Sequence, residues 1–467
     1  MILDSINEID TNKYSVVIFG TGPAGLSLAL ELEKHDISSL IIEAGEENFS
    51  QKSQSFYKID TDGTPLNDLS NSRLRQFGGT SATWGGWSKP LSNLDLVKFG
   101  FEPEEIEKYQ SQTCEILDIK NSFKESSIDE NFNQIEFQFS SVRFYNKYFE
   151  HVKKSKKIFL MLRTQLSHFD GVNKNVEKAV CIRNGKFVEI KSKEFILCCG
   201  GIENSRILLW SKLKNNQLFK NILNIGNYWM THYWVLGGVG FINIKNFESY
   251  MNKDFLNYKG PIHIASTEKQ SNEKLQVGLY LSTNEDQNFI KEIVKSILCI
   301  APEYGKKISK LILNKSLKCG NIFMHIEEDP IFDNKIVLDK NKKDLNGIPF
   351  AKLIYNSSLK SKKIAKQELE KLATLFKEKD LGRVAIADEL FNLREFESLG
   401  DYHHMGGTRI GNSSKDSVIN KNFKVHDLNN LYILGSSNFR IGTYKNPTFA
   451  IIQFSLKLAN DLKNKLV

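Results

Sequence analysis

The sequence predicts an α/β fold in which a discontinuous first domain encloses an α+β domain built on an antiparallel sheet. Three observations predict it. Residues 14–45 read as a strand, a glycine turn, a helix and a second strand, which is one βαβ unit of a parallel sheet. Residues from about 230 to 390 form longer strand-like runs separated by polar loops, as in an antiparallel sheet. The final residues return to glycine turns and buried strands, so we expect a first domain in 1–230 with inserted segments, a second domain in 231–390, and a return to the first in 391–467.

The composition is typical of a globular protein, with 40% hydrophobic and 25% charged residues. The net charge of +8 results from 63 Lys and Arg against 55 Asp and Glu, and the basic residues are scattered. We interpret this excess as a solvated basic surface. The alternative is attraction of an anionic substrate, such as a phosphorylated or nucleotide-linked sugar, and no nucleic-acid binding is expected.

The six cysteines include the adjacent pair Cys198 and Cys199 and show neither a disulfide framework nor a metal-ligand spacing. The acidic N-terminus lacks the features of a secretory signal, and no apolar run is long enough to span a bilayer. We therefore predict a cytoplasmic protein without a metal site or an integral membrane segment. The segment Phe289 to Cys319 is expected to be a half-buried helix, with an amphipathic membrane-surface helix as the alternative.

Other segments are predicted from local patterns. Residues 46–75 are polar and are expected to be a loop, and the run EPEEIEKY (102–109) is expected to be helical. Short alternating runs between about 155 and 197 predict a β-meander that ends in a strand, a glycine turn and a helix at 195–210. In the second domain the strands are expected in the runs GGVGFINI (237–244), LQVGLYLS (275–282) and NIFMHIEE (321–328).

The first glycine turn, GTGPAG, is typical of a dinucleotide site that includes Pro23 and Ala24. Gly20 allows the tight turn, Gly22 lets the backbone approach a pyrophosphate, and Gly25 permits close packing of the helix on the sheet. Glu43 follows about twenty residues later, where its carboxylate can accept hydrogen bonds from the ribose hydroxyls of an adenosine. The motif does not by itself distinguish FAD from NAD.

Later motifs resemble those of the glucose-methanol-choline (GMC) oxidoreductases. The segments GGTSATWGG, CCGGIENSRILL, HHMGGTRIG and LGSSNFRIGTYKNPTFAI occur in the order and approximate spacing seen in that flavoenzyme family. The resemblance covers the N-terminal third, the region 195–210 and the C-terminal residues. The bacterial and pyranose-oxidase-like branches are the most similar, because the C-terminal strand ends in Gly435 and Asn438 rather than an aspartate.

The resemblance implies how this chain would hold FAD. The segment Gly78 to Gly86 would lie along the flavin, with Gly79 admitting it and with Ser81 and Thr83 as hydrogen-bonding side chains. Relatives that attach FAD covalently have a histidine at the position of Thr83, so noncovalent FAD is expected here. Gly435 would lie against the ribityl-pyrophosphate. The segment Gly200 to Arg206 would support the adenosine half, or would be a strand-helix connection without ligand contact.

Oxidation of an alcohol by a flavin needs a group that takes the hydroxyl proton while a hydride leaves carbon for N5, and an imidazole suits this role. The resemblance places that role on His404, which stands four residues before Thr408, and not on its neighbour His403. The second active-site residue of the family falls on Asn446, which can hold the substrate oxygen. Pro447 and Thr448 would then open a C-terminal helix whose N-terminus stabilises negative charge on the reduced flavin. Trp84 and Trp87 are candidate pocket walls.

The leading hypothesis is an FAD-dependent dehydrogenase, rather than an oxidase, that converts an alcohol on a sugar or polyol to a carbonyl. No second GxGxxG and no CxxC is present, which favours reduction of the flavin by an alcohol rather than by NAD(P)H. One alternative is a redox-neutral epimerase or isomerase that uses the same flavin. The other is a non-catalytic flavoprotein or an NAD-binding module. The sequence names neither the substrate nor the electron acceptor.

Overall fold

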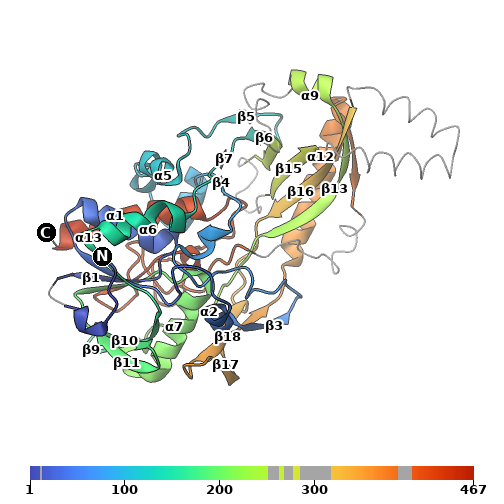
Figure 1. Ribbon diagram of the computed structural model, residues 1–467. Coiled ribbons are helices and arrows are strands. Elements are labelled where there is room, and N and C mark those ends of the chain that lie inside the picture. Colours follow the sequence, from blue (N-terminus) through green and yellow to red (C-terminus); the bar gives the residue numbers. More distant parts are fainter. Residues whose placement is uncertain (11–12, 251–261, 268–276, 284–316, 388–401, 467) are drawn as a thin grey trace.

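The computed structural model describes residues 1–10, 13–250, 262–267, 277–283, 317–387 and 402–466 (Figure 1). The helix expected between Phe289 and Cys319 lies outside the described residues up to residue 316. Its last residues begin strand β16 (Leu317–Ile326).

A five-stranded parallel sheet forms the first layer. Its order is β20-β12-β1-β2-β8, and each neighbouring pair is parallel. The strands are β1 (Val16–Phe19), β2 (Ser39–Ile42), β8 (Ile158–Met161), β12 (Glu194–Leu197) and β20 (Leu431–Ile433). The predicted Rossmann-like sheet built from distant chain segments is therefore confirmed.

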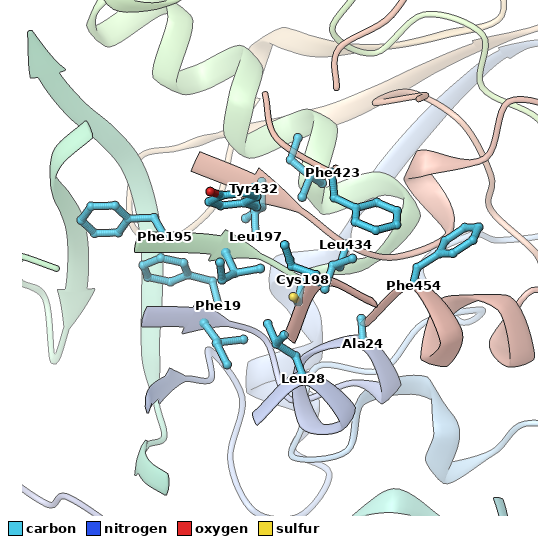
Figure 2. Packing of buried hydrophobic residues seen from close by; sticks show 14 of the residues in the cluster. Phe19, Ala24, Leu28, Phe195, Leu197, Cys198, Phe423, Tyr432, Leu434 and Phe454 are labelled. Atoms are coloured by element: carbon cyan, nitrogen blue, oxygen red, sulfur yellow. The ribbon is translucent and has the colours of Figure 1, made fainter. Parts of the chain in front are cut away.

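Helices and a buried apolar cluster hold this sheet. Helices α1 (Pro23–Lys34) and α13 (Thr448–Leu466) pack against each other. Figure 1 shows α6 (Phe144–Lys154) near these two helices and α7 (Gly200–Lys214) apart from them. Figure 2 shows Phe19, Leu197 and Leu434, from three neighbouring strands or their ends, in one buried cluster. None of the helices in the described part of the chain is long and apolar enough to cross a membrane.

The predicted meander is shorter than expected. Strands β9 (Thr164–Val172), β10 (Asn175–Arg183) and β11 (Lys186–Ile190) form it in antiparallel order. The outer two runs instead supply β8 and β12 of the parallel sheet. Every residue of β12 is buried, which is the pattern of a parallel strand covered on both faces rather than of a half-exposed meander strand.

A seven-stranded antiparallel sheet forms the second part of the fold. The order is β19 (Gly382–Ile386), β13 (Tyr233–Asn243), β16, β15 (Val277–Thr283), β14 (Ile262–Ser266), β6 (Phe132–Ile135) and β5 (Glu125–Ser127). The predicted antiparallel sheet is confirmed, and the three runs named from the sequence all contribute strands to it. The last two strands at one side of the sheet, β6 and β5, come from residues 125–135, so segments of the N-terminal region extend this sheet. The domain boundaries themselves stay a prediction.

Helix α12 (Leu359–Glu378) covers one face of the antiparallel sheet. Leu369 and Phe376 of this helix share a buried cluster with Ile322 and Met324 of β16. Because successive residues of a strand point to opposite faces, the side chain of His325 lies on the other face.

Several smaller elements complete the fold. Residues 46–75 are not simply a loop, because β3 (Ile59–Gly63) pairs in parallel with β18 (Pro349–Tyr355), which also pairs with β17 (Lys335–Lys343). The sequence of β3, IDTDG, is mostly exposed and polar, so no hydrophobic alternation marks it as a strand. The expected helix near 102–109 is present as α4 (Pro103–Glu107). The remaining elements are η1 (Ile6–Glu8), α2 (Gln51–Gln54), η2 (Ser55–Tyr57), η3 (Gly79–Ala82), β4 (Trp87–Ser88), α3 (Asn93–Phe99), α5 (Gln110–Leu117), β7 (Gln138–Phe139), α8 (Asn216–Phe219), α9 (Ile244–Tyr250) and η7 (Ser436–Asn438).

The buried carboxyl group of Glu328, just after β16, predicts a pH-dependent stability. It accepts hydrogen bonds from the Tyr355 hydroxyl (2.5 Å) and the Ser358 amide (3.1 Å), and burial raises its pKa to about 8. The unfolded chain loses this proton above about pH 4.5, whereas the folded chain keeps it up to about pH 8. The contribution is therefore fully present at low pH and falls by roughly 1.4 kcal/mol per pH unit across this window.

Glu328→Gln should remove this decline, because the amide stays neutral and the Tyr355 hydroxyl can accept from it as well as donate. Urea unfolding between about pH 5 and about pH 8 measures the slope. Glu370→Gln, at a more exposed position on α12, is the control and should keep the wild-type slope. An unchanged slope in Glu328→Gln would show that this carboxyl does not set the pH dependence.

Candidate active site

A cavity of about 810 Å³ lies between the two large sheets. One wall is the carboxyl edge of the parallel sheet, where Gly435, Cys199, Gly20 and Glu43 follow the neighbouring strands β20, β12, β1 and β2. The opposite wall includes His325 on the face of the antiparallel sheet turned away from α12. Open α/β sheets bind ligands in this position, and the volume suits a small molecule or cofactor.

Most residues predicted for the site line this cavity. They are Gly20, Gly22, Pro23, Ala24, Glu43, Gly79, Ser81, Thr83, His404, Gly435, Asn446, Pro447 and Thr448. The exceptions are Gly25 and Gly78, which serve packing. A Cβ on Gly25 would lie 2.0 Å from the Gly20 carbonyl oxygen, and one on Gly78, where φ is +83°, would lie 2.6 Å from the Tyr145 nitrogen.

Gly22 differs from the other glycines of its turn. A Cβ on Gly22 would meet no atom within 4 Å, so it would project into the cavity. On Gly20 it would lie 2.5 Å from the Cys198 carbonyl oxygen. The open side of the turn is therefore at Gly22, as expected where a backbone must approach a ligand closely.

Three helices begin at the cavity wall. The N-terminus of α1 follows Gly22, that of α7 is at Gly200 and Gly201, and that of α13 is at Thr448. Free amide groups and the helix dipole make each of these a favourable place for negative charge. For the start of α7, the sequence allowed either a ligand contact or a strand-helix connection without one. In the structure, Gly200 and Gly201 line the cavity.

Some predicted cofactor contacts already have partners within the protein. The Glu43 carboxylate accepts from the Thr21 amide (2.9 Å), the Thr21 hydroxyl (2.6 Å) and the Gly45 amide (2.7 Å), so it holds the glycine turn together. The Ser81 hydroxyl donates to the Gly78 carbonyl oxygen (2.7 Å). Carboxylate oxygens can accept further bonds, so a ribose contact by Glu43 stays a prediction.

Arg75 is a site residue that the sequence analysis missed. It is buried at the cavity wall, its Nη1 donates to the Ser53 hydroxyl (2.7 Å), and its guanidinium lies 4.4 Å from the centre of the Phe56 ring. No carboxylate in the described part of the chain forms an ion pair with it, whereas nearby Arg73 is paired with Glu203 (2.7 Å). Arg75 is thus a cation placed to meet an anionic group of a ligand. The sequence around Arg75 contains no motif that indicates a ligand contact.

The adjacent histidines face different surroundings. His404 Nε2 lies 2.9 Å from the Ser72 hydroxyl, and that hydroxyl donates to the Leu69 carbonyl oxygen (2.9 Å). Because the hydroxyl has one proton, it accepts from His404, whose neutral form then carries its proton on Nε2 and its lone pair on Nδ1.

His403 instead belongs to a group of buried or cavity-lining histidines with His232, His263 and His325. The His232 ring stacks on the His325 ring, with 5.0 Å between ring centres. The His403 ring meets the His232 ring edge-on, with 4.3 Å between ring centres. Burial lowers the pKa of His232 to about 4 and that of His263 to about 3. Sequence analysis missed this group because its members lie far apart along the chain and each looks isolated.

The side-chain amide of Asn446 is hydrogen-bonded at its nitrogen end. Its Nδ2 donates to the Trp87 carbonyl oxygen (2.8 Å). Its Oδ1 is buried and has no hydrogen-bond partner within the described ranges. Trp87 itself lines the cavity, as does Trp84, whose indole N–H donates to the Val142 carbonyl oxygen (2.7 Å).

Comparison with known proteins gives consistent relatives. Residues 332–455 match the model of the GMC oxidoreductase family. The fructose dehydrogenase large subunit of Gluconobacter japonicus is 23% identical over 289 residues, which cover 59% of this chain and 48% of that protein. The 2-methyl-1,2-propanediol dehydrogenase of Mycolicibacterium austroafricanum is 24% identical over 273 residues, covering 58% and 47%. The matched region thus spans about half the length of these curated relatives.

Solved structures match nearly the whole chain. The pyridoxine 4-oxidase of Mesorbium loti superposes with a TM-score of 0.62 at 13% identity, covering 96% of this chain and 99% of that one. An FAD-dependent oxidoreductase of Chaetomium thermophilum gives a TM-score of 0.59 at 12% identity, covering 97% and 99%. These structural likenesses show the fold. Together with the family match over residues 332–455, they confirm the predicted resemblance to the GMC oxidoreductases, which are FAD-binding flavoproteins.

The residues present fit FAD. The open side of Gly22, the helix N-termini and the Arg75 cation, which has no ion-pair partner in the described ranges, suit its pyrophosphate. Thr83, within the Gly78 to Gly86 segment, lies exposed at the cavity wall. The assignment to a pyranose-oxidase-like branch and the noncovalent attachment stay predictions.

Gly22→Ala tests this fit. The methyl group should leave the fold intact and weaken FAD binding by about ten- to a hundredfold, because it occupies space at the phosphate turn. Flavin absorbance per protein and equilibrium rebinding of FAD measure the loss, with circular dichroism as the check on folding.

Two further glycine substitutions serve as controls. Gly240→Ala, where the added Cβ meets the nearest atom at 3.5 Å away from the cavity, should keep FAD. Gly25→Ala should lower stability, since its Cβ would lie 2.0 Å from a backbone oxygen. If Gly22→Ala keeps full FAD affinity, the pyrophosphate does not lie at this turn.

Proposed function

We propose that this protein is an FAD-dependent oxidoreductase that oxidises the CH–OH group of an alcohol to a carbonyl. One observation carries the proposal: a single cavity joins the glycine turn at Gly22 to His404 and Asn446, about four hundred residues later in the chain. One end of the cavity suits a dinucleotide, and the other offers imidazole and amide groups for an alcohol.

The relatives support an alcohol as the substrate. The curated relatives are named as dehydrogenases of fructose and of a propanediol, which favours a sugar or polyol substrate and a dehydrogenase. Two structural neighbours are named as oxidases of pyridoxine and of formate, so the electron acceptor is not assigned. A nucleotide-linked sugar remains within the proposed substrate class.

The chain's own residues would position the reaction. FAD, when bound, accepts the hydride that leaves the carbinol carbon. The family spacing favours His404 as the group that takes the hydroxyl proton, and the Ser72 hydroxyl holds its ring through Nε2. Asn446, which lines the cavity, would orient the substrate. Thr448 opens α13, whose N-terminus favours negative charge at the cavity wall. FAD is held noncovalently in this proposal, because Thr83 offers no suitable nucleophile.

An anaerobic substrate screen tests the function. The purified protein should contain FAD, and its absorption should bleach with one or more of D-fructose, D-glucose, glycerol, 2-methyl-1,2-propanediol and pyridoxine. A carbonyl product should form in proportion. Bleaching without net product would indicate a redox-neutral isomerisation, and a protein that does not bind FAD would contradict the proposal.

His404→Asn should slow flavin reduction by about 10²- to 10⁴-fold, the range for loss of a general base, while FAD stays bound. Stopped-flow reduction under anaerobic conditions measures the rate constant. His151→Asn, at a half-exposed position on α6, is the matched control and should be neutral. Loss of FAD from His404→Asn would instead assign this residue to cofactor binding.

Ser72→Ala should free His404 from the bond that selects its tautomer. We expect flavin reduction to slow by roughly ten- to a hundredfold, as when the partner that orients a functional histidine is removed. The substrate Kd should change little. Ser70→Ala, which removes an exposed hydroxyl bonded to Asp68, is the control. Equal rates in the wild type and Ser72→Ala would show that this bond has no part in the reaction.

A further inference from the structure

The segment 72–75 serves both ends of the cavity, and all four of its residues line it. The Ser72 hydroxyl lies 2.9 Å from Nε2 of His404 at the histidine end. Arg75 is buried at the wall and supplies the cation that suits an anionic group of the cofactor. Arg73 lies between Ser72 and Arg75 in the chain, so its position constrains both of them.

A buried glutamine holds the backbone of this segment. Gln54 Nε2 donates to the carbonyl oxygens of Ser70 and Arg73 (2.7 Å each), and its Oε1 accepts from the Arg75 amide (3.1 Å). These bonds involve only backbone groups of the segment. The side chain of Arg73 has a separate anchor on another element.

That anchor is Glu203, in the first turn of α7. Arg73 Nη1 donates to Glu203 Oε1 (2.7 Å), and both side chains are buried. Arg73 Nη2 donates to the Tyr57 carbonyl oxygen (2.8 Å). Because a hydrogen bond between two charged groups is short and directional, this ion pair restrains the segment from the side of α7.

Glu203 is itself fixed. Its Oε2 accepts from Arg206 Nη1 (2.9 Å), and Arg206 also donates to Asp344 Oδ2 and to the Pro349 carbonyl oxygen (2.7 Å each). Burial alone would raise the pKa of Glu203, but Arg206 and Arg73 bring it below its ordinary value. The carboxylate is therefore ionised at neutral pH and is shared by two buried cations.

We propose that Arg73 and Glu203 are positioning residues, whose buried ion pair holds the segment 72–75 so that Arg75 meets FAD and Ser72 meets His404. In this role Arg73 acts through its two neighbours. An ion pair that only stabilised the fold would instead act independently of Arg75 and Ser72. The proposal rests on the proposed function, because that function assigns FAD and His404 to the two ends of the cavity.

Equilibrium rebinding of FAD to the apoprotein tests the cofactor end. Arg75→Met and Arg73→Met should each raise the Kd for FAD roughly tenfold, as for loss of a hydrogen bond to a charged group. The double variant should bind FAD no more weakly than Arg75→Met, because Arg73 then has no cation to position. Unchanged affinity in Arg75→Met, or a further tenfold loss in the double variant, would overturn this role.

Arg409→Met is the matched control. Arg409 has the same exposed fraction as Arg73, 8%, and shares the Asp416 carboxylate with Arg440, as Arg73 shares Glu203 with Arg206. It is not among the described residues that line the cavity. We expect Arg409→Met to lower the stability and to keep the Kd for FAD, whereas an equal loss of affinity in both variants would overturn the proposal.

Arg73→Lys tests the ion pair itself. It keeps a cation for Glu203 but loses the bond to Tyr57, so its Kd for FAD should lie between those of the wild type and Arg73→Met. If Arg73→Met does not fold, Arg73→Lys takes its place, and its effect should also vanish without Arg75. A Kd in Arg73→Lys equal to that in Arg73→Met would overturn the role of the ion pair.

Histidine NMR of protein saturated with FAD tests the other end. The ¹⁵N signal of His404 Nε2, assigned by comparison with His404→Asn, should shift in Ser72→Ala because the hydroxyl partner is lost. Arg73→Met should shift it in the same direction, and the combination should shift it no further than Ser72→Ala. An unshifted signal in Arg73→Met would overturn the positioning of Ser72.

Neither measurement needs an alcohol, so the two proposals can fail separately. If no alcohol reduces the wild-type flavin but both sets of variants behave as expected, the proposed oxidation fails and the positioning role stands. If an alcohol reduces the flavin but the effects of Arg73→Met and Arg75→Met on FAD binding multiply, the positioning role fails and the oxidation stands.

Discussion

Close backbone packing at the carboxyl edge of the parallel sheet is the constraint on which the rest of the structure depends. Added Cβ atoms on Gly25 and Gly20 would lie 2.0 Å and 2.5 Å from carbonyl oxygens of the βαβ turn and of Cys198. One on Gly201 would lie 2.2 Å from the His404 carbonyl oxygen. The contacts of Gly20 and Gly201 join chain segments about two hundred residues apart, and only glycine permits all three contacts. The position of the histidine therefore depends on the same packing that shapes the cofactor end of the cavity.

The second wall depends on the alternation of a β-strand. In β16, Ile322 and Met324 face α12 and are buried in an apolar cluster, while His325 faces the cavity. A register shift of one residue would exchange these two sets, placing imidazoles against α12 and apolar side chains in the cavity. The apolar face thus holds the histidines in place, so that packing energy and site chemistry are specified by the same strand.

Local motifs predicted the parts of the site that single segments determine. The glycine turn at Gly20 to Gly25, the strands beside it and the start of α13 each have a signature within a few residues, and the structure has them there. The sequence could not predict β3 as a strand, because its exposed residues carry no alternation and β18 supplies the pairing. Arg75 and His232 were missed for a related reason: their importance lies in which partners the tertiary fold provides or withholds, and no local pattern reports that.

The two ends of the cavity differ in charge. The N-terminus of α1 and the guanidinium of Arg75, which has no ion-pair partner in the described part of the chain, give positive potential beside the glycine turn, where the phosphates of a dinucleotide fit. At the histidine end, burial keeps His232, His263 and His403 uncharged at neutral pH, so those side chains add hydrogen-bonding capacity without net charge. An anionic group is therefore favoured beside the glycine turn, whereas these three histidines add no charge at the other end. In the proposed function, this asymmetry would favour the phosphates of a dinucleotide at the glycine turn and a neutral, hydroxyl-bearing molecule at the histidine end.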